Sequence, residues 1–115
     1  MNTNLTPELI FLPWRADALQ QTFSALQHQP WAMLLHSGFA EHAHNRFDIL
    51  VADPRVTLTT RGALTMTQDA EGCQQSDDDP LRLLHAALAH FAFSPAPDED
   101  FPFQGGALGL FGYDL

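Results

Sequence analysis

Apolar runs of strand length, closed by proline, glycine or an Asp-Pro pair, recur along this chain of 115 residues. A run of four to eight apolar or alternating residues between turn residues is typical of a β-strand. The segments that fit are 9–14, 31–36, 47–52, 56–60, 64–67 and 103–113. Because Arg61-Gly62 separates two of them, the segments 56–60 and 64–67 are expected to form a hairpin. The continuous apolar run 31–36 predicts a strand buried on both faces.

Two segments have the helical period instead. The first predicted helix begins at Asp17, a possible N-cap, and runs to about His28. The second begins with Asp79 at the N-cap and Pro80 at the first helical position. Their apolar faces are expected to be Leu19, Phe23 and Leu26 in the first helix, and Leu81, Leu84, Leu88 and Phe91 in the second. With 69–79 as a polar connection, the order of elements predicts an α+β fold with a mostly antiparallel sheet.

The charge of the chain excludes several function classes. The five basic residues are all arginine and face fourteen Asp plus Glu, which gives a formal net charge of −9. Such a chain repels nucleic acid and anionic membrane surfaces. Without lysine it offers no Schiff base and no phosphate-loop lysine. A polar N-terminus, one cysteine and no long apolar run make the cytoplasm the expected location.

A candidate binding site follows the run 31–36. Ser37 stands at its end, and Arg46 closes the polar, His-rich segment 39–46. A hydroxyl and a guanidinium that face each other could hold the two ends of a small zwitterion. The simpler interpretation is that Ser37 only ends a strand and that Arg46 pairs with Asp48.

Three stretches together resemble one family of chorismate-utilising enzymes. They are PWAMLLHSG at 30–38, RFDI at 46–49 and PFQGGALGLFGYDL at 102–115, with 77–81 also in register. The combination is similar to aminodeoxychorismate synthase component I. The glycine-rich stretch is shared in looser form with anthranilate synthase component I, so a parent of that type is the alternative. The resemblance covers the whole chain and implies the N-terminal part of the chorismate-utilising enzyme fold.

The resemblance implies a longer parent enzyme. That enzyme would convert chorismate to 4-amino-4-deoxychorismate, the precursor of p-aminobenzoate in folate synthesis, with ammonia from a glutaminase subunit (component II). Mg²⁺ and a nucleophilic lysine would act at a chorismate site formed by later parts of the sequence. Residues 1–115 are then a single or partial domain of the anthranilate synthase component I N-terminal type, truncated before the chorismate-binding domain. Alone they would be inactive and hold no cofactor.

The family also implies an L-tryptophan pocket. Its matching positions in this chain are Ser37, His44, Asn45, Arg46 and Phe47. His44-Asn45 departs from the Tyr-Ser expected of a close relative, which leaves Ser37, Arg46 and Phe47 as the firmer part. A further segment of the pocket would lie downstream, so this chain is expected to hold half a site at most.

Two functions of other classes stay open. A self-standing module for a small amino acid or metabolite would need a pocket that is complete within this chain. A zinc-binding interaction domain would use His36, His42 and His44, whose spacing allows coordination by imidazole. If the sheet normally continues beyond residue 115, exposed strand edges would also favour self-association of the chain.

Overall fold

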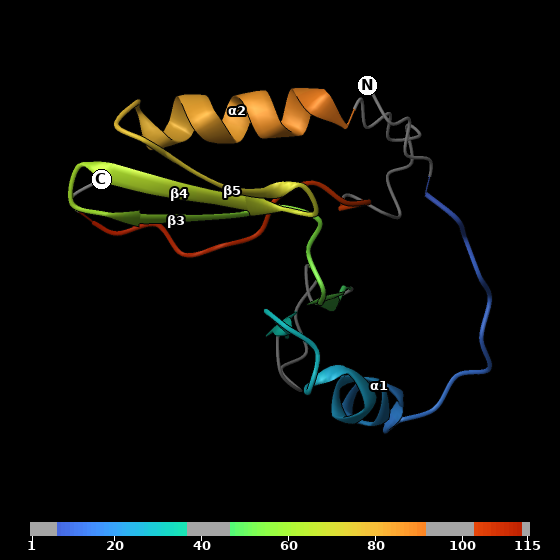
Figure 1. Ribbon diagram of the computed structural model, residues 1–115. Coiled ribbons are helices and arrows are strands. Elements are labelled where there is room, and N and C mark those ends of the chain that lie inside the picture. The colour runs from blue at the N-terminus through green and yellow to red at the C-terminus, as the bar shows by residue number, and fades with distance from the viewer. Residues whose placement is uncertain (1–6, 37–46, 92–102, 114–115) are drawn as a thin grey trace. The chain divides into compact units, whose positions relative to one another are not determined.

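The computed structural model describes residues 7–36, 47–91 and 103–113 (Figure 1). These residues form two helices and two antiparallel sheets, so the α+β prediction is confirmed. The elements are α1 (Ala18–Leu26), β1 (Met33–Leu35), β2 (Ile49–Val51), β3 (Thr57–Arg61), β4 (Leu64–Asp69), β5 (Gly72–Ser76) and α2 (Pro80–His90). The chain divides into two compact units, of which Ile10–Pro54 holds α1, β1 and β2 and the other holds β3, β4, β5 and α2. In these described ranges, neither helix has the length and hydropathy to cross a membrane.

β1 and β2 form a short antiparallel ladder in which Leu34 pairs with Leu50 at the centre. The predicted strands 31–36 and 47–52 are thus confirmed at their centres but are shorter than expected. Burial on both faces was wrong, because no residue of either strand is fully buried. The ladder ends where Trp31 and Asp53 take left-handed backbone angles, φ 59° and 51°. The N–H of Asp53 donates to the C=O of Pro30 at 2.8 Å and closes this end.

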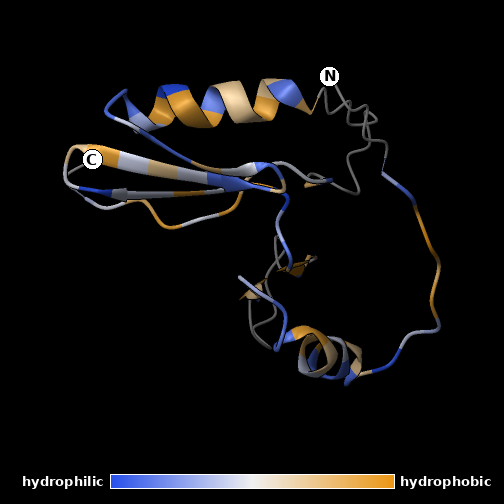
Figure 2. Cartoon of the chain, in the orientation of Figure 1, coloured by the Kyte–Doolittle hydropathy of each residue, from blue (hydrophilic) through white to orange (hydrophobic). Residues whose placement is uncertain are grey.

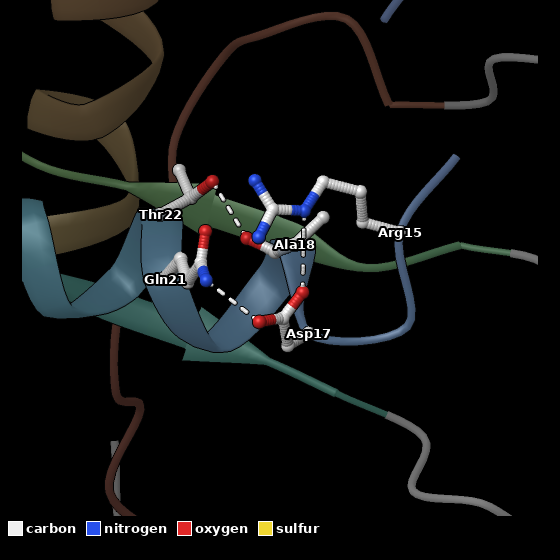
Figure 3. A network of polar contacts seen from close by, with 5 residues as sticks. All are labelled: Arg15, Asp17, Ala18, Gln21 and Thr22. Carbon is white, nitrogen blue, oxygen red and sulfur yellow. Dashed lines mark hydrogen bonds and ion pairs between the residues drawn. The ribbon is translucent and has the colours of Figure 1, made fainter. Parts of the chain in front are cut away.

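The helix α1 confirms the first predicted helix, with Asp17 at its N-cap position. The carboxylate of Asp17 makes no hydrogen bond to a backbone N–H of the helix, so the capping role predicted for it was wrong. Figure 3 shows the reason: Gln21 Nε2 donates to Asp17 Oδ2 at 2.6 Å, and Arg15 Nε lies 3.4 Å from Asp17 Oδ1. Thr22 Oγ1 donates back to the C=O of Ala18 at 2.8 Å. The predicted residues Leu19, Phe23 and Leu26 are half-buried, and so is Ala18 at the start of α1.

The predicted hairpin is present as β3 and β4, which are joined by a two-residue turn. Gly62 stands first in this turn with φ 62°, and Ala63 follows it. A positive φ at the first central residue belongs to the type II′ turn, which suits the right-handed twist of paired strands. Glycine is the residue that enters this region at least cost.

The strand β5 was missed, because residues 69–79 were expected to be a polar connection. Asp69 explains the difference, since its Oδ1 accepts the N–H of Glu71 at 2.8 Å and that of Gly72 at 3.1 Å. Such a side-chain-to-backbone turn reverses the chain within two residues. It sets β5 beside β4 although β5 (GCQQS) is polar and lacks alternation.

Side-chain burial in the three-stranded sheet follows the strand alternation. Thr65 is 1% exposed and is the one fully buried residue among those described. Its hydroxyl lies 2.7 Å from that of its cross-strand partner Thr60. Leu58 and Thr67 share this face by alternation and are half-buried, whereas Met66 on the other face is exposed. The buried centre of this sheet is therefore Thr65, whose hydroxyl contacts that of the exposed Thr60.

The helix α2 begins as predicted. Asp79 Oδ1 accepts the N–H of Leu81 at 3.0 Å, and Pro80 opens the helix. α2 lies alongside the three-stranded sheet and contacts β3 (Figure 1). Its half-buried residues are Pro80, Leu83, Leu84 and Ala87, and the adjoining Phe91 is half-buried as well. Leu81 and Leu88 are exposed, so the predicted apolar face was wrong for these two residues. Leucines at 81, 83, 84 and 88 fit two different helical faces, and the sequence pattern does not distinguish between them.

The segments 9–14 and 103–113 were predicted to be strands, and both predictions were wrong for this chain. A strand is held by hydrogen bonds to a neighbour, and neither segment pairs with a strand in the described ranges. Figure 2 shows hydrophobic residues along both segments. Phe11 is 86% exposed, Trp14 87% and Leu110 99%. No apolar side chain in the described part of the chain is fully buried.

Candidate functional site

The polar centre of the unit Ile10–Pro54 is a contact between His36 and Asp48. The last pair of the ladder is Leu35 with Ile49, so His36 and Asp48 stand opposite each other one step further on. His36 Nδ1 lies 2.6 Å from Asp48 Oδ1, and the two side chains are 34% and 39% exposed. Because an ionised carboxylate only accepts hydrogen bonds, Nδ1 carries the hydrogen and donates it. The tautomer of His36 is thereby fixed by Asp48.

A cavity of about 420 Å³, largely open to solvent, lies at the same end of the ladder. Its walls are formed by Leu34, Leu35, His36, Phe47 and Ile49. Four of these residues are apolar, and the imidazole is the one polar side chain among the described wall residues. Small-molecule sites are usually concave with mainly apolar walls and a few polar groups, and this cavity shares their kind of lining but is more open. The arrangement is suited to a ligand with an apolar or aromatic body.

A second cavity, of about 350 Å³, lies on the side of α1. It is lined by Trp14, Arg15, Ala16, Ala18, Leu19, Gln20, His36 and Asp48. The ion pair of Arg15 with Asp17 and the contact of His36 with Asp48 already engage the charged groups of this region. His36 lines both cavities.

Of the predicted tryptophan-site residues, Phe47 lies within the described structure and lines the apolar cavity. Ser37, His44, Asn45 and Arg46 lie outside the described residues. Asp48, which the simpler interpretation pairs with Arg46, has His36 as a partner. The structure thus places Phe47 in the wall of a cavity, and His36, which was not among the predicted residues of the tryptophan site, lines the same cavity.

The described residues provide no support for the alternative of a zinc-binding domain. His42 and His44 lie outside the described residues, and His36 is bonded to Asp48. In ranges 7–36, 47–91 and 103–113, no three His, Cys, Asp or Glu side chains are placed to hold a metal ion. Cys73 is a free, exposed thiol on β5.

The contact of His36 with Asp48 was not predicted, and the two runs in the sequence indicate only the approximate place of such a contact. Two runs of equal length, 31–36 and 47–52, flank the segment 37–46, and symmetric antiparallel pairing of these runs would set His36 opposite Phe47. The observed register differs by one residue and sets His36 opposite Asp48 instead. The register was needed to see the pair, since a shift by one residue would separate them.

The comparisons with known proteins agree with the three sequence stretches. No protein-family model matches the chain. Aminodeoxychorismate synthase component 1 of Klebsiella aerogenes is 61% identical over 111 residues, which are 96% of this chain and 25% of that protein. The protein of the same name from Salmonella typhimurium is 56% identical over 115 residues, 100% of this chain and 25% of its own length. The one from Escherichia coli is 54% identical over 111 residues, 96% of this chain and 24% of its own.

The expected resemblance is therefore confirmed, and its extent is defined. The chain spans about a quarter of the length of the curated relatives it matches. The matches are more than 50% identical over at least 96% of the chain, so the similarity extends well beyond the three stretches. Over almost its whole length, this chain is a homologue of part of aminodeoxychorismate synthase component 1.

Proposed function

We propose that this chain acts as the N-terminal part of a longer aminodeoxychorismate synthase component 1. The observation that carries the proposal is the 61% identity over 96% of the chain, together with the 25% of the relative that this match covers. The longer enzyme transfers ammonia to chorismate and forms 4-amino-4-deoxychorismate for p-aminobenzoate and folate synthesis. Its location is the cytoplasm.

A glutaminase subunit is the proposed source of the ammonia. The relatives are named as component 1, which supports the presence of a second component. A pull-down with the component 2 protein of Klebsiella aerogenes tests the partnership. The longer protein should retain that partner, and its failure to do so at micromolar concentrations would argue against a two-subunit enzyme.

Catalysis is proposed to lie outside this chain. The chain contains five arginines and no lysine, so it cannot supply the nucleophilic lysine that the family resemblance implies. Chorismate incubated with the purified chain, ammonia and Mg²⁺ should give no 4-amino-4-deoxychorismate by liquid chromatography, while the Klebsiella relative serves as the positive control. Product formed by the chain alone would overturn this placement, and anthranilate formed by the longer protein would identify the other parent type.

Mg²⁺ is proposed for the longer enzyme only. The described residues do not fit a Mg²⁺ site, because no three carboxylate, imidazole or thiol side chains converge among them. Asp79, the last of three consecutive aspartates, is engaged in capping α2. No step of the reaction is therefore assigned to a metal held by these residues.

For this chain itself we propose a share in an L-tryptophan pocket formed by Ser37, His44, Asn45, Arg46 and Phe47. Support comes from Phe47, which lines an apolar cavity of about 420 Å³. Because further walls of the pocket would come from downstream, calorimetry should detect tryptophan binding by the longer protein and none by the chain alone. Micromolar binding by the chain alone would instead favour a self-standing amino-acid module.

A further inference from the structure

The ladder of β1 and β2 is short enough to need support at its ends. It contains three residue pairs, from Met33 with Val51 to Leu35 with Ile49. An isolated two-stranded ladder of this length has marginal stability in water. At one end the backbone hydrogen bond from Asp53 to Pro30 joins the two strands. At the other end the last backbone pair is Leu35 with Ile49.

The contact of His36 with Asp48 lies at that second end. The 2.6 Å distance between Nδ1 and Oδ1 is that of a short hydrogen bond to a charged acceptor. The bond joins the residue after β1 to a residue just before β2, directly across the ladder. It therefore continues the pairing of the strands by one step through side chains rather than through the backbone.

The same contact borders the apolar cavity. His36 is part of the cavity wall, and Phe47 of that wall is the neighbour of Asp48 in the chain. The remaining wall residues Leu34, Leu35 and Ile49 belong to the two strands that the contact joins. If the strand ends separate, Phe47 moves away from Leu35 and the cavity loses its shape.

We propose that His36 and Asp48 are positioning residues, whose hydrogen bond holds the ends of β1 and β2 together and so fixes the cavity that Phe47 lines for the side chain of an amino-acid ligand. The identity of the ligand rests on the proposed function. The bond itself rests on the ladder register and on the geometry of the contact. Neither residue is assigned a contact with the ligand.

The first test needs no ligand. Amide hydrogen exchange on the 115-residue chain compares the wild type with His36→Ala and with Asp48→Ala. A partly exposed hydrogen bond to a carboxylate contributes roughly a fivefold bias toward the closed form, so the amides of Leu35 and Ile49 should exchange about fivefold faster in either variant. Asp78→Ala, which removes an exposed carboxylate from the other unit, is the matched control and should leave these amides unchanged. Unchanged exchange in Asp48→Ala would overturn the proposal.

The second test measures L-tryptophan affinity by calorimetry in the longer protein. Each single variant should weaken binding about fivefold, and the double alanine variant should weaken it no further, because both changes break one bond. A variant in which the two residues are swapped, His36→Asp with Asp48→His, restores a His–Asp pair at the same two positions. It should recover most of the affinity. A role of the imidazole as a direct ligand contact predicts no recovery, and that outcome would overturn a purely positioning role.

The two tests separate the two claims. If the wild-type longer protein binds no tryptophan, the proposed amino-acid function fails, while the exchange measurement still decides whether the bond holds the strand ends. If the strand ends open in Asp48→Ala and tryptophan binds as tightly as before, the positioning role fails although the function stands. Far-UV circular dichroism of each variant verifies that α1 and α2 are retained.

Discussion

Asp17 and Asp79 occupy the same position before two different helices, yet their carboxylates make different bonds. Asp79 accepts the N–H of Leu81 and so satisfies a helix donor that would otherwise lack a partner. Asp17 binds the side chains of Arg15 and Gln21 instead. Its backbone angles of φ −103° and ψ 10° lie outside the extended region typical of an N-cap. The sequence identifies the position of a cap, whereas the bond depends on the backbone angles.

This difference leads to a prediction at the residue scale. Asp79→Ala should destabilise α2 by about 1 kcal/mol, because a backbone N–H loses its acceptor. Asp17→Ala should cost only a few tenths of a kcal/mol, since the contacts it removes are between exposed side chains. Urea unfolding followed by circular dichroism at 222 nm measures both. An equal loss in the two variants would contradict the assignment of a single true cap.

The register of β1 and β2 shows what the sequence could and could not reveal about the site. The apolar runs predicted both strands, and the resemblance directed attention to Phe47, which does line a cavity. The partner of His36 was not predictable, because the facing residue depends on register, and register is fixed only when the strands pair. The outcome for Ser37 and Arg46 stays a prediction.

At the scale of elements, the turn between β4 and β5 explains the strand that the pattern missed. Asp69 holds this turn by accepting two backbone N–H groups. Periodicity carries no information about such a bond, and the polar residues of β5 gave no strand signal. The opposite error occurred at 9–14 and 103–113, where apolar residues indicated strands. Without a pairing neighbour in the described ranges, their backbones do not form a ladder.

The turn also gives a prediction for the sheet. Asp69→Ala should release β5 and leave the β3–β4 hairpin in place, because that hairpin depends on Gly62 instead. Asp69→Asn keeps an acceptor oxygen and should retain most of the pairing. Hydrogen exchange should show faster exchange in β5 by about fivefold for the alanine variant, which is the effect of losing one or two exposed hydrogen bonds. Equal acceleration in β3 would contradict a separate role for this turn.

At the scale of the whole molecule, the main feature is the exposure of large apolar side chains in the described residues. Phe11, Leu12 and Trp14, in the unit Ile10–Pro54, are each at least 80% exposed. Contiguous exposed apolar residues of this kind usually mark an interface. Since the chain spans about a quarter of its relatives, we expect the remainder of the longer protein to cover this surface.

The purified chain should consequently self-associate. Analytical ultracentrifugation over a range from micromolar to millimolar should show dimers or larger species, and Phe11→Glu with Trp14→Glu should shift them toward monomer by placing charges in the contact. Glu8→Gln, which changes a charge beside the segment, is a control for net charge. A wild-type chain that stays monomeric at millimolar concentration would contradict this expectation.

The most direct test of the central claim is exchange of the matched part between homologues. The 111 residues that correspond in the Klebsiella aerogenes relative would be replaced by those of this chain, and the chimera assayed for 4-amino-4-deoxychorismate with chorismate, ammonia and Mg²⁺. If this chain is the equivalent part of the same enzyme, the chimera should be active within about tenfold of the relative, while the chain alone forms no product. A chimera that is folded but inactive, or product formed by the chain alone, would contradict the account.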